Sequence, residues 1–157
     1  MSDFAIEHGH ADYDAAELLE QAQANAQAML VATAAFLAER AIAVETWAIA
    51  LGDVFGRGWG EPRPWDASEF LDAMLTNYRA LGADVLVARL EIDRAEATIG
   101  KFPNPELCAA FGLEPSIADG FHDAAAAIAT PRGLVWRWVR DGDDVHFLVE
   151  RAAVVEA

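Results

Sequence analysis

The sequence predicts an α+β fold, with a helical N-terminal half packed on a mostly antiparallel sheet that ends in a C-terminal hairpin. Two observations lead to this prediction. Apolar residues recur at helical spacing as far as about residue 81, and strand-like alternation replaces that spacing from residue 85. Near the C-terminus, the favoured turn dipeptide Asp141-Gly142 lies between two runs rich in β-branched and aromatic residues. No long linker divides the 157 residues, so we expect one domain over residues 1–157.

The expected helices begin and end at recognisable signals. Asp14 is a suitable N-cap for the first helix, and Glu17 stands three residues on, at the spacing of a capping box. Residues 1–12, before this helix, are expected to form a flexible tail or a short lead-in. Glycines and prolines in residues 56–64 end the second helix, and Gly82 ends the third. The expected helices cover residues 14–42, 44–55, 66–81, 105–112 and 117–129.

Strands are expected at residues 85–92 and in the hairpin, while residues 93–99 either continue the first strand or turn helical. Closing the hairpin turn between Arg140 and Asp143 fixes its register by counting. That register places Trp136 across from Phe147, and Arg137 across from His146. One face of the hairpin is then apolar, and the other mixes charged and apolar side chains.

Composition excludes some classes of partner. Hydrophobic residues make up 54% of the chain, which predicts a packed core. Eleven Lys and Arg stand against 26 Asp and Glu, and the formal charge of −15 argues against nucleic acid and anionic membranes as partners. A single cysteine, Cys108, excludes an intramolecular disulfide framework and suits a reducing compartment. With no signal peptide and no apolar run long enough to span a bilayer, we expect a soluble cytoplasmic protein.

Arg137 and His146 are the first candidates for chemistry. Opposed on one hairpin face, they are suited to hold a small anion, with the guanidinium forking onto a carboxylate and the imidazole exchanging protons near neutrality. Arg89 and Glu91 could join them from the preceding strand, and Trp136 is a further candidate substrate contact. The alternative is an ordinary solvated hairpin face.

His122 and Cys108 complete the candidate catalytic residues. His122 precedes Asp123, but adjacent helical residues point about 100° apart and cannot form a relay with each other. Its alternative role is a histidine on a helix surface. Cys108 stands near the start of a short helix, where a thiol pKa can fall, and its alternative role is an inert core residue. His8, His10 and these residues share no metal-ligand spacing, so no metal site is expected and no cofactor is identified.

A series of features from Val85 to Glu150 resembles the L-2-amino-thiazoline-4-carboxylic acid hydrolase-like family of small α+β proteins. The series is a strand, then Lys101-Phe102-Pro103 before a short helix ending in Phe111-Gly112-Leu113, a helix with Asp123, Thr130-Pro131-Arg132-Gly133-Leu134 entering a strand, and Gly142-Asp143-Asp144-Val145-His146-Phe147 at a turn. The resemblance implies hydrolysis of a small molecule. The family has cysteines where this chain has Phe102 and His146, so thiol chemistry at those positions is not expected.

Three functions remain open from the sequence. The first is a hydrolase or lyase acting on a small anionic substrate, with His146 as acid or base and Arg137 as anion clamp. The second is a non-catalytic protein of the same fold that holds a small apolar or aromatic ligand. The third is an interaction module that forms a homo-oligomer or binds a partner through a tryptophan-rich surface.

Overall fold

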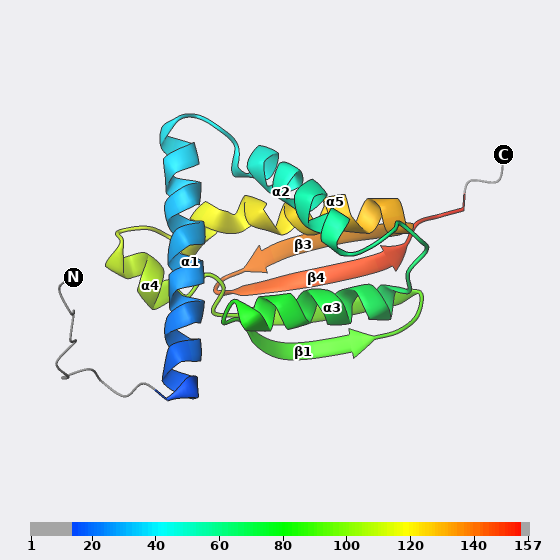
Figure 1. The fold of residues 1–157 in the computed structure, drawn as a ribbon, viewed down its shortest axis with the longest axis horizontal. Helices are drawn as coiled ribbons and strands as arrows, with labels where there is room; N and C mark the ends of the chain where they lie inside the picture. The colour runs from blue at the N-terminus through cyan, green and yellow to red at the C-terminus, as the bar shows by residue number, and fades with distance from the viewer. Residues whose placement is uncertain (1–13, 155–157) are drawn as a thin grey trace, which may run out of the picture.

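The computed structural model describes residues 14–154 and has the predicted α+β architecture (Figure 1). The N-terminal half is helical, and the sheet is four-stranded, antiparallel and ordered β1-β2-β4-β3. The helices are α1 (Ala15–Glu39), α2 (Val44–Gly58), α3 (Ala67–Ala80), α4 (Pro105–Ala110) and α5 (Ala124–Ala129), with 3₁₀ segments η1 (Pro115–Asp123) and η2 (Thr130–Arg132). The strands are β1 (Asp84–Leu90), β2 (Arg94–Gly100), β3 (Leu134–Asp141) and β4 (Asp144–Arg151). The expected tail at residues 1–12, with His8 and His10, lies outside the described residues.

Helices cover one face of the sheet and leave the other open. α3 packs on β1, β2 and β4, α5 packs on β3, and α2 lies over α5. α1 runs crosswise to α3 and α5 at one end of this layer (Figure 1). Alternate residues of β2 and β4 are buried against the helices, so the core lies between the two layers. Within residues 14–154, no helix is long and apolar enough to cross a membrane.

The long first helix begins as its sequence predicts. The Glu17 amide donates to Asp14 Oδ1 over 2.9 Å, and the Asp14 amide donates to Glu17 Oε2 over 3.0 Å, so the capping box is present. The second helix is longer than expected, because it continues through Gly56 to Gly58 before Gly60 adopts a positive φ of 83°.

Periodicity left one segment undecided between strand and helix and assigned another to the wrong kind of helix. Residues 94–100 are the separate strand β2, in which Ala95, Ala97 and Ile99 face the core. The helix expected over residues 117–129 is divided, and its first part is 3₁₀ rather than α. A Cβ atom on Gly120 would lie 2.8 Å from the Glu45 backbone nitrogen, so this segment is packed closely against the start of α2.

The predicted hairpin register is wrong by two residues. The turn is Gly142-Asp143, closed by Asp141 and Asp144, and Gly142 has a φ of 61°. Glycine occupies only the first of the two central positions, which is the pattern of a type II′ turn. The chain adopts this turn instead of the predicted turn at Asp141-Gly142. Trp136 therefore pairs with Val149, and Arg137 pairs with Leu148 instead of His146. A shift of two residues leaves every side chain on its predicted face.

Candidate functional site

The open face of the sheet carries the predicted anion-binding residues. A depression of about 580 Å³ on this face is lined by both Arg137 and His146, together with Glu96, Thr98 and Val139. The two side chains lie in different cross-strand rows, since His146 pairs with Val139. The structure thus brings these two predicted residues to one depression without the direct opposition that the sequence suggested.

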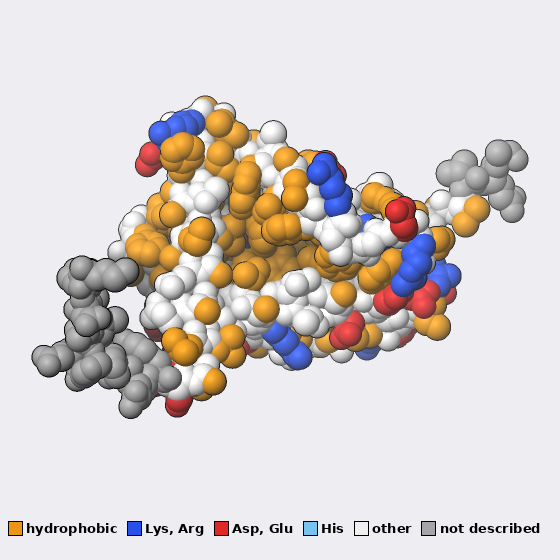
Figure 2. Space-filling model, viewed as in Figure 1, with side chains coloured by type: hydrophobic (Ala, Val, Ile, Leu, Met, Phe, Trp, Pro, Cys, Tyr) orange, Lys and Arg blue, Asp and Glu red, His pale blue; other side chains and the backbone are white. Residues whose placement is uncertain are grey.

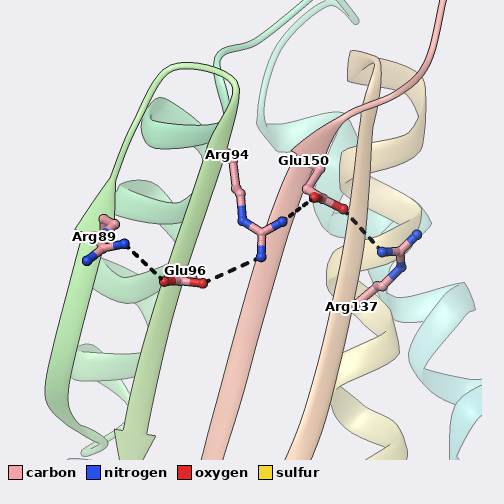
Figure 3. A network of polar contacts seen from close by, with 5 residues as sticks. All are labelled: Arg89, Arg94, Glu96, Arg137 and Glu150. Carbon is pink, nitrogen blue, oxygen red and sulfur yellow. Dashed lines mark hydrogen bonds and ion pairs between the residues drawn. The ribbon is translucent and has the colours of Figure 1, made fainter.

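A ladder of ion pairs crosses this face and involves each of its arginines (Figure 3). Arg89 lies 3.8 Å from Glu96, Glu96 lies 3.8 Å from Arg94, Arg94 lies 2.7 Å from Glu150, and Glu150 lies 3.1 Å from Arg137. Every arginine of the ladder already faces a carboxylate. An incoming anion would have to compete with Glu150 for Arg137, so this face is poorly suited to clamp one.

The other predicted residues of this group are dispersed. His146 is half-exposed, and its Nδ1 lies 2.7 Å from Thr98 Oγ1. Glu91 is exposed in the connection after β1 and does not line the depression described above. Trp136 lies on the inner face of the sheet, where its ring centroid is 4.6 Å from that of Phe147. Because it is buried on the opposite face, Trp136 cannot contact a molecule bound beside Arg137.

His122 is buried in the core, with 1% of its surface exposed, so its assignment to a helix surface is wrong. Its Nδ1 lies 2.6 Å from the Tyr78 hydroxyl, and Asp123 instead accepts a hydrogen bond from Trp138 Nε1 over 2.7 Å. Burial, with a smaller contribution from the charge of Arg140, lowers the pKa of His122 to about 3. Burial also raises the pKa of Tyr78. The imidazole is therefore neutral near pH 7.

Cys108 is fully buried in α4, and burial raises the pKa of its thiol. This environment matches the inert core residue that was the alternative in the sequence. His146 lies on the open face of the sheet and His122 lies on its helical side, so the candidate catalytic histidines do not share a site. Among residues 14–154, no group of three or more His, Cys, Asp or Glu side chains is arranged to hold a metal ion.

An apolar groove that the sequence did not predict lies on the helical side. Its main cavity, about 530 Å³, is lined by Val54, Phe55, Gly58, Trp59, Met74, Asn77, Tyr78, Ala80, Leu81, Phe121, Ala124, Ala125 and Ile128. A second cavity of about 250 Å³ shares Phe55, Leu81 and Phe121 with it and extends toward α1. We call the two together the apolar groove. Figure 2 shows it as a hollow of hydrophobic side chains between α2 and α3.

The polarity of the groove differs from that of the whole chain. No Asp, Glu, Lys or Arg is among the described residues that line either cavity, although the chain carries a formal charge of −15. Its polar lining groups are the side chains of Asn77 and Tyr78 and the Trp59 indole N–H in the main cavity, and the side chains of Gln27 and Thr33 and the Trp47 indole N–H in the smaller one. One signal was available in the sequence, because Leu51, Val54 and Phe55 stand at i, i+3 and i+4 and give α2 one broad apolar face.

A third cavity, of about 540 Å³, is lined by Arg57 and the buried Arg132. The Arg132 guanidinium donates to the carbonyl oxygens of Ile128, Gly56 and Gly60 over 2.9, 3.2 and 3.3 Å. These carbonyls belong to the end of α5, to α2 near its C-terminus and to the loop beyond it, where a cation is favourable. Arg132 therefore joins two helices, which accounts for its burial without a ligand.

Comparisons with protein families, curated proteins and solved structures found nothing that matches this chain.

Proposed function

We propose that this protein is a small-molecule binding protein whose apolar groove holds an uncharged, largely apolar ligand. The observation that carries the proposal is the main cavity of the groove, between α2 and α3, with its uncharged lining. Its volume of about 530 Å³ lies within the range of cavities that enclose molecules of the size of a drug or cofactor.

The chemistry of the lining defines the class of ligand. Trp59, Tyr78 and Phe121 offer aromatic surface, while Val54, Met74 and Ile128 offer aliphatic surface. The Asn77 amide stands near the end of α3 and provides a donor and an acceptor for one polar group. With no charged lining residue to compensate it, a ligand carboxylate or phosphate would lose solvation without gaining a partner.

The hydrolase function suggested by family resemblance remains a prediction, but the arrangement of its residues does not favour it. Arg137 is already paired with Glu150, and Cys108 and His122 are enclosed in the core. A reaction at any of these groups would need a movement that opens the core or breaks the ion-pair ladder. Binding to the apolar groove needs neither.

A pair of matched variants tests the proposal. Val54 and Ile49 are β-branched residues of α2 with 54% and 48% of their surface exposed, and Val54 lines the groove whereas Ile49 does not. The uncharged fluorophore N-phenyl-1-naphthylamine should bind the wild type saturably, with energy transfer from Trp59. Val54→Glu should weaken this binding by about tenfold or more, since a carboxylate enters the apolar mouth, and Ile49→Glu should leave it unchanged. Equal affinity in all three proteins would rule out the groove as the binding site.

A further inference from the structure

The side of α1 that faces away from the core has an unusual composition. Within this 25-residue helix the buried residues are Gln27, Leu30, Val31 and Ala34. The opposite side carries Leu18, Ala22, Asn25, Met29, Ala32 and Phe36, which are all exposed. We call these six residues the outer stripe of α1. Met29, at the edge of the stripe where it also borders the smaller cavity of the apolar groove, has 73% of its surface exposed, and Phe36 has 52%, so large apolar side chains face solvent here.

The spacing of the outer stripe is that of a coiled coil. Its members follow one another at intervals of 4, 3, 4, 3 and 4 residues, which is the a/d pattern of a heptad repeat. No Asp, Glu, Lys or Arg occurs in α1 between Gln21 and Ala38. Figure 2 likewise shows charged side chains only toward the ends of this helix. A single helix gains nothing from a heptad seam turned away from its own core, whereas a second helix would cover it.

We propose that the outer stripe binds the same stripe of a second copy of this chain, with the two α1 helices antiparallel. Charge complementarity selects this partner and this direction. Asp14 and Glu17 lie at the N-terminal end of α1. The other end carries a neutral pair, in which the Arg40 guanidinium lies 3.9 Å from the Glu39 carboxylate and 3.5 Å over the Phe36 ring. An antiparallel copy brings Arg40 to the partner's acidic end, whereas a parallel copy would set the two acidic ends side by side.

One antiparallel register satisfies the whole stripe. Setting Leu18 against Phe36 of the second copy also sets Ala22 against Ala32, Asn25 against Met29, and Asp14 against Arg40. Ala22 and Ala32 are small enough for close approach of the two helix axes, at roughly 8–10 Å. Asn25 is the polar member of the seam and faces Met29 of the second copy, so it weakens the association relative to an all-apolar seam. A helix pair of this length makes an interface at the small end of the specific range, so we expect a dissociation constant in the micromolar range.

Two matched alanine positions test the interface. Ala32 lies in the outer stripe, whereas Ala38 is exposed on the same helix away from it. Sedimentation velocity from roughly 1 to 200 µM, in salt of about 0.15 M to screen the acidic chains, should show a reversible dimer for wild type and for Ala38→Glu. Ala32→Glu should raise the dissociation constant more than tenfold while its circular dichroism spectrum stays that of the wild type. A monomeric wild type, or equal effects of the two substitutions, would overturn the proposal.

Cross-linking tests the direction. When Ala22→Cys and Ala32→Cys proteins are mixed and oxidised, the disulfide should form between the two different variants, because these positions face each other only in the antiparallel pair. Each variant alone should cross-link slowly. Rapid cross-linking of Ala22→Cys to itself would show a parallel pair and overturn the assigned register, and so would an absence of cross-links in the mixture.

Discussion

One titratable side chain in the core, His122, links the stability of this fold to pH. Its pKa is lowered to about 3 in the folded chain, against an ordinary value of 6.5. As pH falls below 6.5, the unfolded chain binds this proton first, so stability that is fully present above pH 6.5 is lost progressively toward pH 3. Each proton bound only by the unfolded state contributes a slope of about 1.4 kcal/mol per pH unit.

Urea unfolding of wild type and His122→Gln between pH 7.5 and pH 4.5 measures that contribution. The variant should be less stable at pH 7.5, because a glutamine side chain does not reproduce the packing of the buried imidazole or its 2.6 Å contact with the Tyr78 hydroxyl, but its free energy of unfolding should depend less steeply on pH below 6.5. The other titrating groups act in both proteins and cancel in the comparison. Parallel pH dependences would mean that folding does not lower the pKa of His122.

At the scale of secondary-structure elements, Arg132 holds the end of α5 to the α2 C-terminus and the loop beyond it. Arg132→Met removes the donors to three carbonyl oxygens, two of them in or after α2, and should reduce the free energy of unfolding by about 2–5 kcal/mol. Arg132→Lys should recover only part of this loss, since an ammonium cannot reproduce the planar guanidinium.

Arg57 provides the control for this prediction. It lines the same cavity but is exposed, so Arg57→Met should change the free energy of unfolding by less than about 0.5 kcal/mol. Chemical denaturation of the three variants beside the wild type measures the differences. Similar losses for Arg57→Met and Arg132→Met would show that the lining of the cavity, rather than the hydrogen bonds of Arg132 to the two helices, determines stability.

Elements were predictable from the sequence where local signals decide them. The capping box of α1 and the faces of the hairpin follow from residue spacing alone. The hairpin register depends on whether the turn is Asp141-Gly142 or Gly142-Asp143, and counting residues along the two strands does not distinguish these turns. The 3₁₀ segment η1 packs against the start of α2 where Gly120 approaches Glu45, a contact between residues 75 positions apart that local periodicity does not contain. His122, two residues further on in η1, is buried rather than exposed.

At the scale of the whole molecule, the apolar groove arises from the placement of α2 beside α3 over η1 and α5, with α1 at one end. None of these helices carries the groove alone, so no sequence motif marks it. The predicted residues Arg137 and His146 line one depression, as the sequence suggested. The ion-pair ladder beside them depends on the register between the four strands β1, β2, β4 and β3. Glu150, which pairs with Arg137, was consequently missing from the sequence-based site.

The methionines of this chain allow the central claim, ligand binding in the apolar groove, to be tested directly. Met74 lines the main cavity, Met29 lines the smaller one, and Met1 is the third methionine. In a protein labelled with ¹³C at the methionine methyl groups, 2-naphthol should shift the Met74 resonance saturably, and Met29 less. Met74→Leu and Met29→Leu assign the two signals. If 2-naphthol binds, as shown by its own fluorescence, while the Met74 resonance does not move, the groove is not the ligand site and the account is contradicted.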